Sequence, residues 1–271
     1  MVTEVTLGPG FLTRFNSSKE IADGGGFAEI TDGVLRGALM DSRISMLVIR
    51  RTRKELFADT VKAFMASQPD TLAIAGCFAD NGTMKAGVGI KVGSGLLAPD
   101  LQGNMGFIVE GGQRIGEARP GRAFLIVDAD RKIRIGPGDT PPDAVHGFSG
   151  LGAMILAGRK FPSNDPADQG RDEFYRGQAA RGGFGGQTVV AIAEKEGLIL
   201  ALAKPHGRIL ALDDIRDRLF ESGFSDAVFL DGSDSVFWNL RGTVPDGFTQ
   251  GIDKDRVTTF GLAFLRPRVN R

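Results

Sequence analysis

Residues Ser225–Trp238 read Ser-Asp-Ala-Val-Phe-Leu-Asp-Gly-Ser-Asp-Ser-Val-Phe-Trp. The apolar run Val228–Leu230 suits a buried strand, because branched and aromatic side chains pack well on a pleated surface. The next residues, Asp231–Ser235, are turn formers, and they predict that the strand stops at Asp231. Leu210–Gly223 predicts a helix that packs ahead of the strand. A buried strand that runs into a polar loop with two carboxylates is suited to present functional side chains.

The same layout occurs earlier in the chain. Thr71–Phe78 predicts a strand that runs into the turn-forming series Ala79–Gly82. Asp80 therefore follows its strand as Asp231 follows its own. Because both carboxylates stand at strand ends, we expect them to converge on one crevice.

The rest of the chain consists mainly of short apolar runs separated by glycine turns. Thr52–Ser67 carries apolar residues at helical spacing and predicts a helix. Pro162–Gly186 is polar and rich in charge, glycine and aspartate, and we expect a long mobile loop there. The other predicted elements are a strand at Ile44–Ile49, a meander over Gly87–Ile135, a hairpin of Thr188–Ala193 with Leu198–Ala203, and a final strand at Phe260–Leu265.

Length and composition bound the fold class. The chain has 271 residues, of which 42% are hydrophobic, so it can bury a sizeable core. Its 39 glycines favour many tight turns between short strands over long helices. We therefore predict an α+β fold in a single sheet-rich domain, residues 1–271, with mixed β-sheets and a few flanking helices. Residues 1–32 form an N-terminal edge segment and residues 33–265 the core.

Charge and cysteine content exclude several classes of function. The 33 basic residues balance the 33 acidic ones, so we expect no nucleic acid and no membrane as partner. Cys77 is the only cysteine, which excludes an internal disulfide and a cysteine zinc cluster. Asp231, Ser233 and Ser235 have the alternate spacing of a calcium loop, but the downstream glutamate is missing, so we expect no metal. No cofactor is expected.

The sequence leaves the compartment open. Met1–Phe11 lacks the basic start and apolar core of a signal peptide, and no run approaches the roughly 18 apolar residues of a membrane span. We expect a soluble chain. An exported protein whose signal has been trimmed is the alternative.

The order of these segments over about residues 33–265 resembles the phosphodiester glycosidase family. The closing motif of that family, of the type Asn-Leu-Asp-Gly-Gly-Gly-Ser, corresponds to Phe229–Ser235. This chain keeps four of its positions, namely Leu230, Asp231, Gly232 and Ser235.

Two other family motifs have counterparts in this chain. An early motif of the type Asn-Gly-Gly-Phe-Phe corresponds to Ala75–Ala79, which keeps Gly76 and Phe78. A strand start of the type Arg-Thr-Ala corresponds to Gln187–Val189, where glutamine replaces the arginine. That replacement removes a bidentate phosphate clamp, because glutamine carries no charge.

The resemblance implies cleavage of the bond between an anomeric carbon and a phosphodiester oxygen, with a carbohydrate or sugar phosphate as substrate. The best candidates for its catalytic carboxylates are Asp231 and Asp80, because each follows an apolar strand. The substrate-binding residues that it implies, together with nearby cations that would replace the lost arginine, are Gly76, Gln187, Thr188, Gly232, Asp234, Ser235, Arg181 and His206. Lys204 and Arg159 are further candidates for the replacing cation.

Two other functions remain open on the sequence. A noncatalytic carbohydrate-binding or scaffold protein would have kept the fold and lost the chemistry, as Ala75, Gln187 and Phe229 in altered motif positions indicate. A delivered effector with a changed substrate is suggested by the polar segment Pro162–Gly186 alone.

Overall fold

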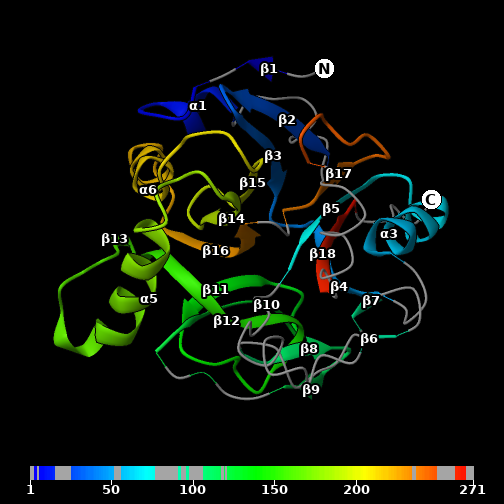
Figure 1. Ribbon diagram of the computed structural model, residues 1–271, viewed down its shortest axis with the longest axis horizontal. Helices are drawn as coiled ribbons and strands as arrows, with labels where there is room; N and C mark the ends of the chain where they lie inside the picture. The colour runs from blue at the N-terminus through cyan, green and yellow to red at the C-terminus, as the bar shows by residue number, and fades with distance from the viewer. Residues whose placement is uncertain are drawn as a thin grey trace.

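The computed structural model describes residues 3–4, 6–15, 26–51, 56–76, 91–92, 96–97, 106–116, 119, 121–233, 236–248 and 260–266. For residues 3–4, 14–15, 91–92, 96–97 and 231–233 it describes the backbone. Within these ranges the chain is an α+β structure in which sheets predominate and a few helices flank them (Figure 1). The predicted fold class is confirmed. No helix in the described ranges has the length and apolar character needed to cross a membrane.

The helical elements are α1 (Phe11–Phe15), α3 (Phe57–Ser67), the short 3-10 helix η2 (Pro166–Asp168), α5 (Gln169–Ala179) and α6 (Leu212–Glu221). The strands are β1 (Thr3–Glu4), β2 (Phe27–Asp32), β3 (Leu35–Asp41), β4 (Ser45–Arg50), β5 (Thr71–Ala75), β6 (Lys91–Val92), β7 (Leu96–Leu97), β8 (Ile108–Glu110), β9 (Gln113–Ile115), β10 (Ala123–Asp128), β11 (Ile133–Pro137), β12 (Ala144–Leu156), β13 (Arg159–Lys160), β14 (Gly186–Ala193), β15 (Leu198–Lys204), β16 (Asp226–Ser233), β17 (Trp238–Leu240) and β18 (Phe260–Leu265).

Most strands belong to one large sheet. Its main path runs β1-β2-β3-β15-β14-β16-β12-β10-β11, with β8 and β13 attached beside β12 and β9 beside β8. β1 pairs parallel with β2, and the other neighbours on this path pair antiparallel. The long β12 joins two halves of the sheet, because its first part pairs with β10 and β8 and its second part pairs with β16.

Glycines allow β12 to make this connection. Gly147 and Gly150 lie within the strand at φ angles of 138° and 75°, a region that L side chains rarely adopt. Gly152 faces the ring of Phe229, and a Cβ at Gly152 would come within 1.9 Å of that ring. The glycine-rich composition of this segment therefore serves bending and close packing.

A second sheet, of order β17-β5-β18-β4, packs against the first. One of its faces contributes Leu72, Ile74, Leu262 and Phe264 to the main core. The other face is covered by α3, which buries Phe57, Val61 and Met65 against it. Helices α5 and α6 lie on the other side of the large sheet, beside β12 and β16 (Figure 1).

Most of the predicted elements are confirmed. The strand Phe260–Leu265 coincides with β18, and the predicted hairpin and the helix ahead of β16 are found as β14 with β15 and as α6. One boundary is wrong: β16 does not stop at Asp231 but continues to Ser233. The turn formers extend the strand because Ser233 pairs with Gly186 on β14.

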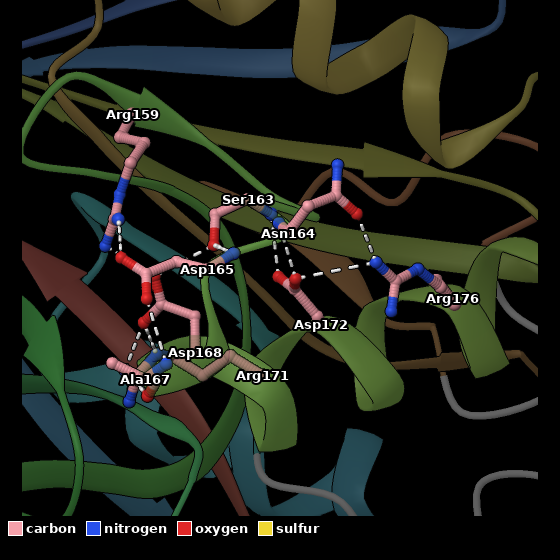
Figure 2. Close-up of polar contacts among 9 residues, drawn as sticks. All are labelled: Arg159, Ser163, Asn164, Asp165, Ala167, Asp168, Arg171, Asp172 and Arg176. Atoms are coloured by element: carbon pink, nitrogen blue, oxygen red, sulfur yellow. Dashed lines mark hydrogen bonds and ion pairs between the residues drawn. The ribbon is translucent and has the colours of Figure 1, made fainter.

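The expectation of a long mobile loop over Pro162–Gly186 is wrong for most of that segment. η2 and α5 fill most of it, and its buried side chains include the carboxylates of Asp168 and Asp172. Figure 2 shows the polar contacts around these carboxylates. Asp172 accepts hydrogen bonds from the backbone N–H groups of Ser163 and Asn164, both at 2.7 Å. The polar composition indicated exposure, but here polar side chains bind the chain to itself.

Asp168 is the centre of this network. Its carboxylate is 2% exposed and accepts hydrogen bonds from Ser163 Oγ and Arg171 Nε, each at 2.9 Å. Arg159 Nη2 lies 2.5 Å from the same carboxylate. Burial by itself raises the pKa of Asp168, but the hydrogen bonds from Arg171 and Ser163 and the charges of Arg171 and Arg159 outweigh it and hold the pKa below 3.8.

Asp168→Asn is expected to lower the free energy of unfolding by about 2 to 3 kcal/mol at pH 7, because two arginines lose a buried partner. Since the folded pKa lies below the unfolded one, this stabilisation is present above about pH 4 and is lost as the pH falls through the folded pKa. The difference between wild type and variant should therefore shrink in denaturation curves recorded from pH 5 down to pH 2.

The matched control is Asp165→Asn. Asp165 is 45% exposed and pairs with Arg159 at 3.2 Å, so its replacement should cost less than about 1 kcal/mol. Equal losses in both variants would contradict the role assigned to Asp168.

Candidate functional site

The end of β16 carries a β-bulge at the predicted catalytic residue. Thr188 of β14 pairs with Leu230, and Gly186 pairs with Ser233. Between these two pairs β16 has two residues, Asp231 and Gly232, whereas the opposing strand β14 has one, Gln187. The extra residue on β16 is a β-bulge. Bulges re-aim side chains and are frequent next to active sites. The backbone of Asp231 thus stands at an irregular strand end, beside the start of β14.

The strand β5 contacts β16. Gly76 follows β5 and is buried. A Cβ at this position would come within 2.7 Å of the carbonyl oxygen of Phe260 and 2.8 Å of Phe148 Cζ. Close packing therefore requires a glycine here, and contact with a substrate stays a prediction. Asp80 lies outside the described residues.

Gln187 and Thr188, at the start of β14, each carry a buried side-chain oxygen. Within the described ranges neither Gln187 Oε1 nor Thr188 Oγ1 has a hydrogen-bond partner. Gln187 is half-buried and Thr188 is completely buried. Buried polar atoms without a partner are uncommon in folded proteins, and an absent ligand or water is one explanation for them. These two side chains point to opposite faces of the strand.

Lys204 lies opposite Gln187 on β15 and is completely buried. Its Nζ donates hydrogen bonds to three backbone carbonyls, those of Gly183, of Gly185 at 2.5 Å and of Arg208 at 2.8 Å. Burial lowers the pKa of Lys204 to about 8. This ammonium fastens the loop that precedes β14, so it does not replace the arginine that the family motif has at Gln187.

The other predicted cations are placed differently. Arg159 pairs with Asp165 and Asp168 in the network before α5. Arg181 is exposed in the turn after α5. His206 contacts the ring of Phe184, with ring centroids 5.4 Å apart. Their assignment to a substrate phosphate stays a prediction.

Phe229 stands where the family motif has asparagine, and its side chain belongs to the core. Its ring stacks on Phe174 with centroids 5.6 Å apart and meets Tyr175 edge to face at 6.1 Å. Phe229 is 4% exposed. This motif position therefore offers a substrate no polar group.

The structure brings forward Arg122, which the sequence reasoning missed. Its guanidinium lies 3.3 Å above the ring of Phe174, on the α5 side of the sheet. An arginine between a glycine and a strand has no distinctive sequence pattern. The ring on which Arg122 lies belongs to a helix about 50 positions later in the chain. Asp234 and Ser235 lie outside the described residues, and Gly232 lies within β16.

No protein-family model matches the sequence, and no curated protein matches it. Among solved structures, the chain is similar to the zebrafish N-acetylglucosamine-1-phosphodiester alpha-N-acetylglucosaminidase catalytic domain, auto-inhibited by its pro-peptide. That match has a TM-score of 0.57 and 16% identity and covers 89% of this chain and 82% of the other. A hypothetical protein from Synechocystis matches with a TM-score of 0.50 and 11% identity, covering 90% of this chain and 65%, less than two thirds, of that one. At these identities the likeness is one of fold, and this chain shares its fold with a glycosidase catalytic domain.

Proposed function

We propose that this protein is a glycosidase that hydrolyses a sugar phosphodiester or a related glycosyl bond, with Asp231 as its catalytic carboxylate. The observation that carries the proposal is the bulge that sets Asp231 and Gly232 at the irregular end of β16. A fold shared with the catalytic domain of a sugar phosphodiester glycosidase gives this position its chemical interpretation.

The proposed chemistry needs few groups. A phosphate monoester leaves far more readily than a sugar alcohol, so strong acid assistance to the leaving group is not required. One carboxylate acting as nucleophile or base, with donors to the phosphate oxygens, is sufficient. Asp231 takes the first role, and Asp80 is the second carboxylate of the proposed site.

The remaining groups of the proposed site would orient the substrate. Gln187 is better placed than Thr188 to reach it, because Gln187 is half-buried and Thr188 completely buried. Gly76 and Gly232 would allow close approach of the substrate to the backbone. Asp234 and Ser235 would hold sugar hydroxyls, and Arg181 and His206 are the proposed cations near the phosphate.

A noncatalytic carbohydrate-binding protein is the second candidate. It is favoured by the burial of Phe229 in the core, in a motif position where the family has a polar residue. Gln187 in place of an arginine favours it too. Such a protein would bind glycans without consuming them.

The experiment that separates the two is a panel of sugar phosphodiesters and nitrophenyl glycosides offered to the wild type and to Asp231→Asn. Turnover that the variant loses supports the glycosidase. Saturable binding of the same sugars without product supports the second candidate. If neither turnover nor binding is detected across a broad sugar array, both proposals fail.

The stereochemistry of the product would show whether the reaction retains or inverts the anomeric configuration. In glycosidases, carboxylates about 5 to 5.5 Å apart retain the anomeric configuration, and a separation of about 6.5 to 9.5 Å inverts it. Proton NMR of the first sugar released would therefore report how far apart Asp231 and Asp80 lie in the working enzyme.

A further inference from the structure

Among the described residues Arg122 has no counter-charge, unlike the half-buried Arg171 and Arg216 beside α5. Arg171 and Arg216 are 15% and 13% exposed, and each pairs with a carboxylate, Asp168 or Asp217. For Arg122, the described part of the chain supplies no ion-pair partner, and its Nη1 is buried without an acceptor. A desolvated guanidinium without an acceptor is costly, and an absent anion is one explanation for it.

A second cation lies nearby. Burial, followed by the charge of Arg119, lowers the pKa of Arg122 to about 10. The backbone N–H of Arg119 donates to Asp139 Oδ1 at 3.1 Å, which fixes the loop without neutralising Arg122. Two arginines of one loop therefore add positive potential at the same place.

The position of Arg122 is held from two sides. Its backbone carbonyl accepts a hydrogen bond from Gly138 N at 2.6 Å. Gly121 lies against Gly170 of α5 so closely that a Cβ on Gly121 would come within 3.3 Å of Gly170 Cα. Arg122 is thus held in place on the ring of Phe174 before any ligand arrives.

The strand register places Arg122 at the level of Phe229, two strands away from β16. Arg122 precedes Ala123, which pairs with Leu151, and the next residue, Gly152, pairs with Phe229. Arg122, Phe174 and Phe229 form a continuous stack from the loop to β16. Asp231 follows Phe229 by two positions on the same strand.

We propose that Arg122, supported on Phe174 and assisted by Arg119, is the cation of an oxyanion-binding site that receives a phosphoryl group. A planar guanidinium presents paired donors that match two oxygens of a phosphate. The identification of that phosphoryl group as part of the substrate rests on the proposed function. In that case Arg122, just before β10, does what the arginine of the family motif would do from the position of Gln187.

The test is titration of inorganic phosphate into wild type, Arg122→Gln and Arg131→Gln, followed by calorimetry and by the melting temperature. Wild type should bind phosphate saturably, and Arg122→Gln should bind it about 10- to 100-fold more weakly, as expected for a lost charge-assisted hydrogen bond. Arg131→Gln removes the same charge from an exposed side chain in the turn between β10 and β11 and should bind like wild type.

No saturable binding by wild type, or equal binding by wild type and Arg122→Gln, would overturn the proposal. If circular dichroism shows that Arg122→Gln does not fold, Arg122→Lys decides. It keeps the charge and loses the paired planar donors, so it should weaken phosphate binding by several-fold. Undiminished binding by a folded Arg122→Lys would overturn the proposal as well.

Failure of this site and failure of the glycosidase are distinguishable. Asp231→Asn should bind inorganic phosphate at least as tightly as wild type, because its change removes a negative charge. Phosphate binding that depends on Arg122 without hydrolysis of any sugar would leave the oxyanion site standing and the glycosidase rejected. Hydrolysis that depends on Asp231 but is unchanged in Arg122→Gln would leave the glycosidase standing and the oxyanion site rejected.

Discussion

Asp231→Asn is expected to lower kcat for hydrolysis of a sugar phosphodiester by about 10³-fold, within the range that a positioned catalytic carboxylate contributes. Asparagine has nearly the same shape as aspartate but cannot take up a proton or attack an anomeric carbon. KM should change little, because the backbone at the bulge and the neighbouring donors are kept. Initial rates for wild type and variant over a range of substrate concentrations measure both constants.

The matched control is Asp130→Asn, which makes the same change in an exposed turn between β10 and β11. Its kcat should equal that of the wild type. Wild-type turnover by Asp231→Asn would remove Asp231 from the mechanism. A similar loss for both variants would point to net charge or contamination.

A small anion can test the chemical role further. In Asp231→Ala the missing carboxylate leaves space, and added azide or formate is expected to restore part of the turnover if Asp231 acts as nucleophile or base. No rescue in a folded variant would favour a binding role for Asp231 over a chemical one.

The sequence predicted the strands well where burial is continuous. Phe260–Leu265 and the hairpin of β14 and β15 are apolar along their length, and apolar runs of strand length bounded by turn residues carry a strong signal. The predicted end of β16 was wrong, because Gly232 and Ser233 are turn formers on their own and become strand residues only when paired with β14. Cross-strand pairing overrode local preference there.

The prediction of a mobile loop over the polar segment around α5 was wrong for a related reason. Its helix buries Asp172 and Tyr175 where a sequence pattern expects apolar residues, and the carboxylates gain their partners from the preceding loop. The setting of Arg122 likewise depends on Phe174, a residue of this helix. Pairings between distant segments are invisible in one sequence. The single-domain organisation and the site residues accordingly remain predictions.

Lys204→Met is expected to lower the free energy of unfolding by about 3 kcal/mol or more at pH 7. Methionine fills most of the space but takes the donor from the carbonyls of Gly185 and Arg208, and each buried acceptor left unpaired costs about 1 to 3 kcal/mol. The carbonyl of Gly183 keeps the backbone N–H of Leu210 as a donor. For a chain of this size the loss corresponds to roughly 10 °C in Tm. Lys195→Met, in the exposed turn between β14 and β15, should leave Tm nearly unchanged.

The pH dependence of this difference tests the burial of the ammonium itself. The pKa of Lys204 is about 8 in the folded chain, below its ordinary value of 10.5. Between these two values the unfolded chain binds more protons than the folded one, so the stability of the wild type rises with pH. Lys204→Met lacks this titration, and the gap between the two proteins should widen from pH 8 to pH 10 and stay flat below pH 7. Denaturant titrations at several pH values measure the gap. A gap that stays constant up to pH 10 would mean that the three carbonyls hold the proton as firmly as water does, and that this loop is fastened by a permanent charge.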